Sequence, residues 1–259
     1  MILQRRARQL GIPPPPSPLP EGFAKIKFLL VMTVWRPLHM LFTEPIVIAF
    51  GIYVAFNFAI LYGFFAAFPA VFEGIYGFNT GESGLVFLAI AVGNVVGYAA
   101  FVFIDRLTFR PLALAAKARQ DTGAIPPETR LYSALIGAFL LPISLFWFAW
   151  TARPTIHWIC PVIASVPFAV GNVLVFYSAM LYMIDTYGPL GGASAVAANG
   201  LLRYALGAGF PLFIQQMYSK LGVDWATSLF AFITLLLLPI PWMLVKWGPE
   251  LRRKSSYIK

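Results

Sequence analysis

Six long apolar runs divide this sequence of 259 residues. Each run is close to or above the roughly 20 residues that a helix needs to cross the hydrocarbon core of a bilayer. Apolar residues in the runs are continuous and do not alternate with polar ones, which favours helices over barrel strands. The sequence therefore predicts an all-α integral membrane protein with six transmembrane helices, at about Ile46–Phe68, Leu85–Ile104, Tyr132–Trp150, Ile159–Met183, Gly192–Met217 and Ala226–Trp247.

Composition excludes most soluble functions. Only 11% of the residues are charged and 59% are hydrophobic, whereas a soluble domain has about 25% charged residues. A net charge of +9 would suit a nucleic-acid partner, but no basic stripe with interleaved aromatic residues exists, so we expect none. Because no phosphate loop, dinucleotide fingerprint or zinc-ligand spacing is present, we expect no catalytic residue, no metal site and no cofactor.

Basic residues set the expected orientation. Six Lys and Arg residues precede the first run, five lie between the second and third runs, and five lie from Lys246 to the end. The opposite side has only Arg153 and Lys220. Because cytoplasmic loops carry the excess of Lys and Arg, both termini are predicted to be cytoplasmic.

Three regions follow from this reading. Residues 1–45 are expected to form a cytoplasmic N-terminal segment without the pattern of a signal peptide. It holds a stiff proline-rich spacer, Gly11–Pro20, and a mixed basic and apolar stretch, Phe23–Pro37, predicted to lie as a short helix in the membrane interface. Residues 46–247 are the predicted six-helix bundle, and residues 248–259 a basic cytoplasmic tail.

Polar residues occur near the middle of four runs. Asn57, Asn94, Asn172 and Arg203 lie in the first, second, fourth and fifth runs. Residues of this kind face protein or water rather than lipid, so these runs are predicted to share an inner face, with the third and sixth outside. The pattern repeats after three helices and predicts two inverted three-helix repeats, an arrangement typical of secondary transporters. The alternative for each asparagine is an interhelical hydrogen bond.

A weak internal sequence repeat adds two tyrosines to this set of candidate residues. "NFAILY" (Asn57–Tyr62) and "NVLVFY" (Asn172–Tyr177) share the spacing Asn-x4-Tyr at corresponding places. Tyr62 and Tyr177 are therefore candidates for the inner face, although such tyrosines more often pack than bind.

Arg203 is the most costly residue of the set. Eleven residues at 1.5 Å each from Gly192 place it about 16 Å into its helix, where an arginine costs about 2.5–3.5 kcal/mol. Asn199 lies one turn earlier on the same face. No carboxylate lies at that depth in the sequence, so we expect Arg203 to face a wet cavity, an acid on another polypeptide, or a ligand. The alternative is a structural arginine bonded to backbone carbonyl groups.

Six stretches of the sequence carry a family resemblance: "RPLHMLFTEPIV" (Arg36–Val47), "GFNTGESGLVFLAIAVG" (Gly77–Gly93), "PETRL" (Pro127–Leu131), "LFWFAWTARPTIHWICP" (Leu145–Pro161), "AANGLLRYALGAGFPLF" (Ala197–Phe213) and "MYSKLGVDWATSLFAF" (Met217–Phe232). They resemble the C-terminal half of fungal drug:proton antiporters of the major facilitator superfamily, in the branch of polyamine and azole or cycloheximide exporters. Asp105-Arg106-x3-Arg110 is similar to a degenerate second copy of the superfamily's cytoplasmic gate motif; the alternative is that it marks only the topology.

The resemblance implies one half of a twelve-helix major facilitator fold in the plasma membrane. The complete transporter would act in multidrug efflux, exporting small organic compounds such as drugs, toxins or polyamines, and this export would be coupled to protons. Its partners would be the bilayer, the substrate, and a missing N-terminal half or a second copy. The alternative is a truncated membrane fragment or gene-model remnant that transports nothing. The expected cavity residues are Asn57, Asn94, Asn172, Asn199, Arg203, Tyr62 and Tyr177, and the expected gate residues are Asp105, Arg106 and Arg110.

Overall fold

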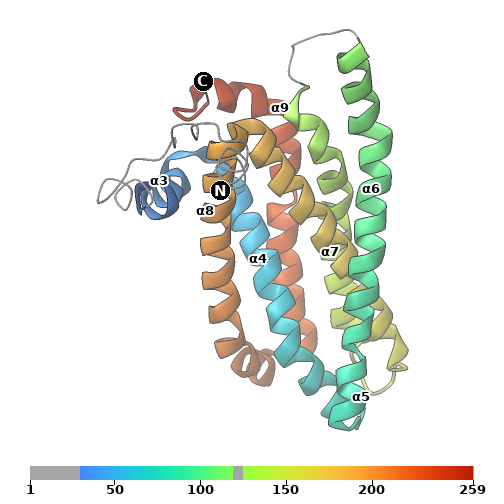
Figure 1. The fold of residues 1–259 in the computed structure, drawn as a ribbon. Coiled ribbons are helices and arrows are strands. Elements are labelled where there is room, and N and C mark those ends of the chain that lie inside the picture. The colour runs from blue at the N-terminus through green and yellow to red at the C-terminus, as the bar shows by residue number, and fades with distance from the viewer. Residues whose placement is uncertain (1–29, 119–124, 259) are drawn as a thin grey trace, which may run out of the picture.

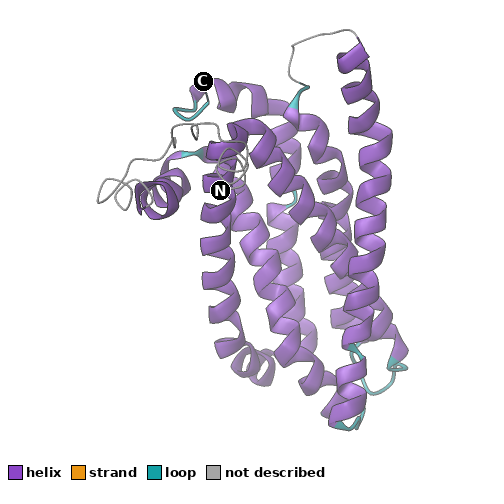
Figure 2. Ribbon diagram, viewed as in Figure 1, coloured by secondary structure: helices purple, strands orange, loops and turns teal. Residues whose placement is uncertain are grey.

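The computed structural model of the chain describes residues 30–118 and 125–258. Over these ranges the fold is helical, and the helices are joined by short loops (Figure 2). Helices suit apolar sequence of this length because every backbone N–H and C=O group is bonded within the segment. In chain order they are η1 (Val31–Trp35), α3 (Arg36–Thr43), α4 (Pro45–Phe68), η2 (Pro69–Glu73), α5 (Thr80–Leu85), α6 (Phe87–Ala118), η3 (Pro127–Leu131), α7 (Tyr132–Thr151), α8 (Ile159–Leu237) and α9 (Pro239–Lys254).

The longest element, α8, is broken twice by glycine. Gly188 has φ 68° and ψ −175°, and Gly222 has φ 77° and ψ 161°. Glycine adopts positive φ without the steric cost that a side chain brings. The chain reverses at both points (Figure 1), so α8 consists of a first arm (residues 159–187), a second arm (189–221) and a third arm (223–237).

Five segments are long and apolar enough to cross a membrane, counted over the described ranges. The fifth has 64 residues and includes the Gly222 turn, so it is far longer than one crossing requires. The described part of the chain is thus helical, with the long apolar segments of an integral membrane protein. The segments are Pro45–Glu73, Thr80–Ala115, Pro127–Thr151, Ile159–Pro189 and Gly191–Lys254.

Aromatic side chains form the centre of the bundle. The ring of Phe64 on α4 lies 5.0 Å from Phe168 on the first arm of α8 and 5.4 Å from Phe148 on α7, measured between centroids. Phe68 stacks on Phe148 at 5.9 Å. Edge-to-face and offset contacts of this kind stabilise aromatic pairs beyond the burial of their area, so they hold α4, α7 and α8 together.

Helix boundaries differ from the sequence expectation at two places. The interfacial stretch is described only from Leu30 onward, and there the helix does not stop at Pro37 but continues as α3. Proline is tolerated there because it occupies the first turn of α3. At the other end α9 runs without a break through position 248, so the expected tail begins inside a helix.

Candidate functional site

A small pocket lies between α4, α6 and two arms of α8. Its volume is about 120 Å³. The structure brings three of the expected residues together there, namely Asn94, Asn172 and Arg203, although they come from three different helical segments. We call it the Arg203 pocket; its lining is Phe58, Leu61, Asn94, Asn172, Val173, Phe176 and Arg203.

Three aromatic rings surround the guanidinium of Arg203. Its Cζ atom lies 4.9 Å from the ring centroids of Phe58, Phe176 and Tyr204. Rings at this distance attract a cation through their quadrupole. The sequence reading offered water, an acid, a ligand or carbonyl groups as partners for Arg203; the structure adds an aromatic cage.

The cage leaves most donors of Arg203 unused. Nη2 donates to the Tyr204 hydroxyl at 3.1 Å, and the buried Nε has no hydrogen-bond partner within the described chain. No acidic group within the described ranges forms an ion pair with it. A guanidinium has five N–H donors in a planar fork, so the pocket presents a fixed positive charge with open donors.

The asparagines of the Arg203 pocket are also open. Asn94 is exposed and Asn172 half-buried, and neither carboxamide makes a hydrogen bond to another described residue. Each can both donate and accept. Together with Arg203 they give the pocket three polar side chains among its apolar lining residues.

The structure separates Asn57 and Asn199 from this pocket. Asn57 is 1% exposed inside the bundle, where its carboxamide lies beside the Tyr53 hydroxyl but does not reach hydrogen-bond geometry with it. Asn199 is buried and donates through Nδ2 to the carbonyl oxygen of Phe50 at 3.3 Å. Neither belongs to the lining of the Arg203 pocket, and both are buried in the helix packing. Asn199 forms an interhelical hydrogen bond.

The two tyrosines lie beside the Arg203 pocket and pack on aromatic neighbours. Tyr62 is 39% exposed, and its ring centroid lies 4.7 Å from that of Phe58. Tyr177 packs on Tyr98 at 5.7 Å and on Phe101 at 5.4 Å. Both rings extend the aromatic surface around the pocket without lining it.

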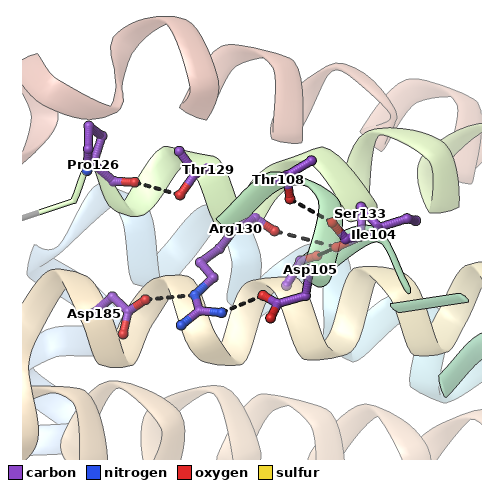
Figure 3. Close-up of polar contacts among 9 residues, drawn as sticks. Ile104, Asp105, Thr108, Pro126, Thr129, Arg130, Ser133 and Asp185 are labelled. Atoms are coloured by element: carbon purple, nitrogen blue, oxygen red, sulfur yellow. Dashed lines mark hydrogen bonds and ion pairs between the residues drawn. The ribbon is translucent and has the colours of Figure 1, made fainter. Parts of the chain in front are cut away.

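A second polar cluster joins α6, η3 and the first arm of α8. The Arg130 guanidinium bonds Asp105 Oδ1 through Nη1 at 2.5 Å and Asp185 Oδ2 through Nε at 2.9 Å, as Figure 3 shows. Its Cζ also lies over the Phe109 ring. We call this the Arg130 bridge; it ties three helical elements together at the end of the bundle.

The Arg130 bridge differs from the expected gate. Asp105 takes part, but Arg106 and Arg110 are exposed and form no ion pair with any described residue. The sequence reading missed Arg130 and Asp185 as members. Arg130 stands in "PETRL" directly before the third run, and Asp185 is an acidic residue at the end of the fourth. Both lie on the predicted cytoplasmic side, which is the signal that could have joined them.

Two further acidic residues are buried near the same end. Glu44, which precedes α4, is 2% exposed and accepts a hydrogen bond from the Tyr187 hydroxyl at 2.9 Å. Glu128 in η3 is 9% exposed and pairs with Nη2 of Arg252 on α9 at 2.9 Å. Both lie at helix ends, and neither contacts Arg203.

Comparisons with known proteins agree with this architecture. The family model described as Major Facilitator Superfamily matches residues 8–211. The chain is 41% identical to "Polyamine transporter 4" of Saccharomyces cerevisiae, over 99% of the chain and 42% of that protein. It is 45% identical to "Efflux pump FUBT" of Fusarium oxysporum, over 86% of the chain and 36% of that protein.

A third relative shows the same partial coverage. The chain is 39% identical to "Major facilitator superfamily multidrug transporter mdrA" of Aspergillus fumigatus, over 99% of the chain and 42% of that protein. The chain thus spans less than half the length of these curated relatives. No solved structure matched it.

Proposed function

Because the chain belongs to the major facilitator superfamily, whose members are transporters rather than enzymes, we propose that it works as the C-terminal half of a twelve-helix, proton-coupled exporter of small organic compounds. The observation that carries this proposal is the Arg203 pocket. It combines a fixed cation, two open carboxamides and aromatic walls on helices long enough to cross a membrane.

Six crossings are the topology that we propose. The Gly222 turn divides the 64-residue segment into two helices that run in opposite directions. Together with the other four segments they give two three-helix units of opposite orientation. This arrangement, with polar groups between the units, is typical of secondary transporters. It leaves both termini on the cytoplasmic side, and the membrane we propose is the plasma membrane.

The Arg203 pocket opens on the least covered side of the bundle. Only 28% of the apolar stretch of α6 is buried, against 67% of that of α4. Asn94 on α6 is exposed, and Tyr204 beside Arg203 is 61% exposed. Polar groups at membrane depth require protein or water against them. We therefore assign this face to contact with a second half, either a separate N-terminal half or another copy.

The proton is expected to travel through that second half. The buried acids Glu44 and Glu128 lie at helix ends, away from Arg203. The chain alone is thus expected to carry no substrate-driven proton flux. The Arg130 bridge would close the cytoplasmic end when the two halves rock about the pocket, since ion pairs at one end stabilise one of the two states.

A chimera tests the proposal. The chain replaces the matching part of the multidrug transporter of Aspergillus fumigatus, and drug efflux is measured in a yeast strain sensitive to that drug, beside the chain alone. We expect efflux from the chimera and none from the chain alone. A chimera that reaches the cell surface without any efflux contradicts the proposal, and robust efflux by the 259-residue chain alone contradicts the need for a second half.

A further inference from the structure

The charge of the Arg203 pocket indicates which class of compound the pocket binds. We propose that it binds the carboxylate end of an aromatic organic acid, so that this half of the transporter selects against ammonium groups. The inference rests on the proposed function, because it names the class of substrate for the same pocket. One of the relatives is named a polyamine transporter, so the charge of the pocket decides between two different classes of compound.

Arg203 is placed for a carboxylate. The rings of Phe58 and Phe176 hold its guanidinium while the fork itself has one hydrogen bond, to Tyr204. The buried Nε–H has no partner in the described part of the chain. A carboxylate accepts two parallel N–H bonds from such a fork, and these charge-assisted bonds are about twice as strong as neutral ones.

The other lining residues fit the rest of an aromatic acid. Asn94 and Asn172 have free carboxamides whose NH₂ groups donate to the same carboxylate. Leu61, Val173 and Phe176 supply apolar walls for a ring. The pocket therefore offers donors for one end of the molecule and apolar contact for the other.

The size of the pocket limits what enters it. About 120 Å³ is well below the roughly 300–1,000 Å³ of sites that enclose a whole drug-sized ligand. One ring with its acid group fits, and the remainder of a larger substrate extends toward the exposed side chain of Asn94. A like charge such as an ammonium group is repelled by the guanidinium, which stays protonated at physiological pH.

The test compares three small probes of one shape: benzoate, neutral benzamide and cationic benzylamine. Their binding to the purified 259-residue chain in zwitterionic nanodiscs is measured by ligand-observed NMR titration. We expect benzoate to bind about tenfold more tightly than benzamide, as a charge-assisted bond predicts, and benzylamine to bind most weakly. Arg203→Ala should remove the preference, and Arg253→Ala, which deletes an exposed arginine of α9, should keep it.

A second variant covers the case in which Arg203→Ala does not fold. Asn94 is exposed, so Asn94→Leu leaves the helix packing intact and should weaken benzoate binding without affecting benzylamine. Benzylamine binding as tightly as benzoate, no benzoate binding, or a preference that survives in both variants overturns the inference. Efflux by the chimera is measured separately from binding. Efflux without the preference for benzoate refutes only the substrate class inferred for the pocket, whereas the preference without efflux refutes only the proposed export function.

Discussion

The backbones of Gly137 on α7 and Gly171 on the first arm of α8 lie against each other. A Cβ atom at Gly137 would lie 2.7 Å from the carbonyl oxygen of Gly171, and one at Gly171 would lie 2.8 Å from that of Gly137. Small residues allow membrane helices to approach this closely, and van der Waals packing then holds them together. This contact holds α7 against the arm of α8 that carries Asn172.

Gly137→Ala is therefore expected to destabilise the bundle. The new Cβ meets backbone, which cannot move aside as a flexible side chain can, so we expect a loss of about 1–3 kcal/mol in the free energy of unfolding. Gly209→Ala is the matched control because nothing lies within 4 Å of its Cβ position. Thermal unfolding of both variants in detergent checks the difference; equal stability of the two contradicts the close contact.

Loss of the Arg130 bridge should destabilise the state in which the cytoplasmic end of the transporter is closed. Arg130→Lys keeps the charge, but a point-like ammonium cannot reproduce the fork that reaches both Asp105 and Asp185. We expect a cost of up to about 1 kcal/mol for each ion pair, and reduced efflux by the chimera.

Arg106→Ala is the control for that experiment. Its side chain is exposed and has no ion pair with a described residue, so efflux should stay near the level of the unchanged chimera. If Arg106→Ala impairs efflux more than Arg130→Lys does, the gate lies where the sequence motif placed it and not at the Arg130 bridge.

Tyr76 ties the loop after η2 to the end of α7. Its hydroxyl lies 3.1 Å from the carbonyl oxygens of both Thr151 and Arg153, and burial raises the pKa of Tyr76 above its usual value of 10.0. Tyr76→Phe should cost about 1 kcal/mol. The control is Tyr132→Phe, since Tyr132 is 45% exposed and makes no hydrogen bond to a described residue.

The pH dependence of that contribution has a definite sign. A raised folded-state pKa means that the folded chain holds the proton more tightly, so the stabilisation is complete below the unfolded value of 10.0 and is lost as the pH rises through the folded value. Unfolding measured at neutral pH and above pH 10 should show the difference between wild type and Tyr76→Phe shrinking at the higher pH. A difference that grows instead would refute the assignment.

Cysteine labelling distinguishes the pocket residues from the buried ones. In a Cys160→Ser chimera, Asn94→Cys and Asn172→Cys should react with a water-soluble thiol reagent, because both positions line the Arg203 pocket. Asn57→Cys should be protected to the same degree as Leu141→Cys, since these side chains are 1% and 0% exposed. Equal labelling at all four positions would remove the distinction.

The sequence predicted apolar helices, but it did not predict which face of each helix turns toward the Arg203 pocket. Run length is enough to indicate a crossing, because a backbone in lipid must satisfy its own hydrogen bonds. Depth along a run does not say which way a side chain points. Asn57 and Phe58 are neighbours about 100° apart around α4, and it is Phe58 that lines the pocket while Asn57 is buried.

Contacts between segments far apart in the chain also could not be predicted from the sequence. Arg130 and Asp185 are separated by 55 positions, and only the packing of η3 against α8 brings them together. The cage of Arg203 is partly local, since Tyr204 is its chain neighbour, and partly distant, since Phe58 comes from α4. A costly arginine could be noticed from its position alone, but its partners required the fold.

The most direct measurement of the central claim is efflux by Arg203 variants of the chimera at matched surface expression. If Arg203 lines the substrate cavity, Arg203→Lys should reduce efflux despite keeping a cation, and Arg203→Ala should reduce it further. Neither should prevent insertion, because lysine at that depth costs about as much as arginine and alanine inserts more easily than either. An Arg203→Ala chimera that reaches the surface and exports at the unchanged rate would contradict the account.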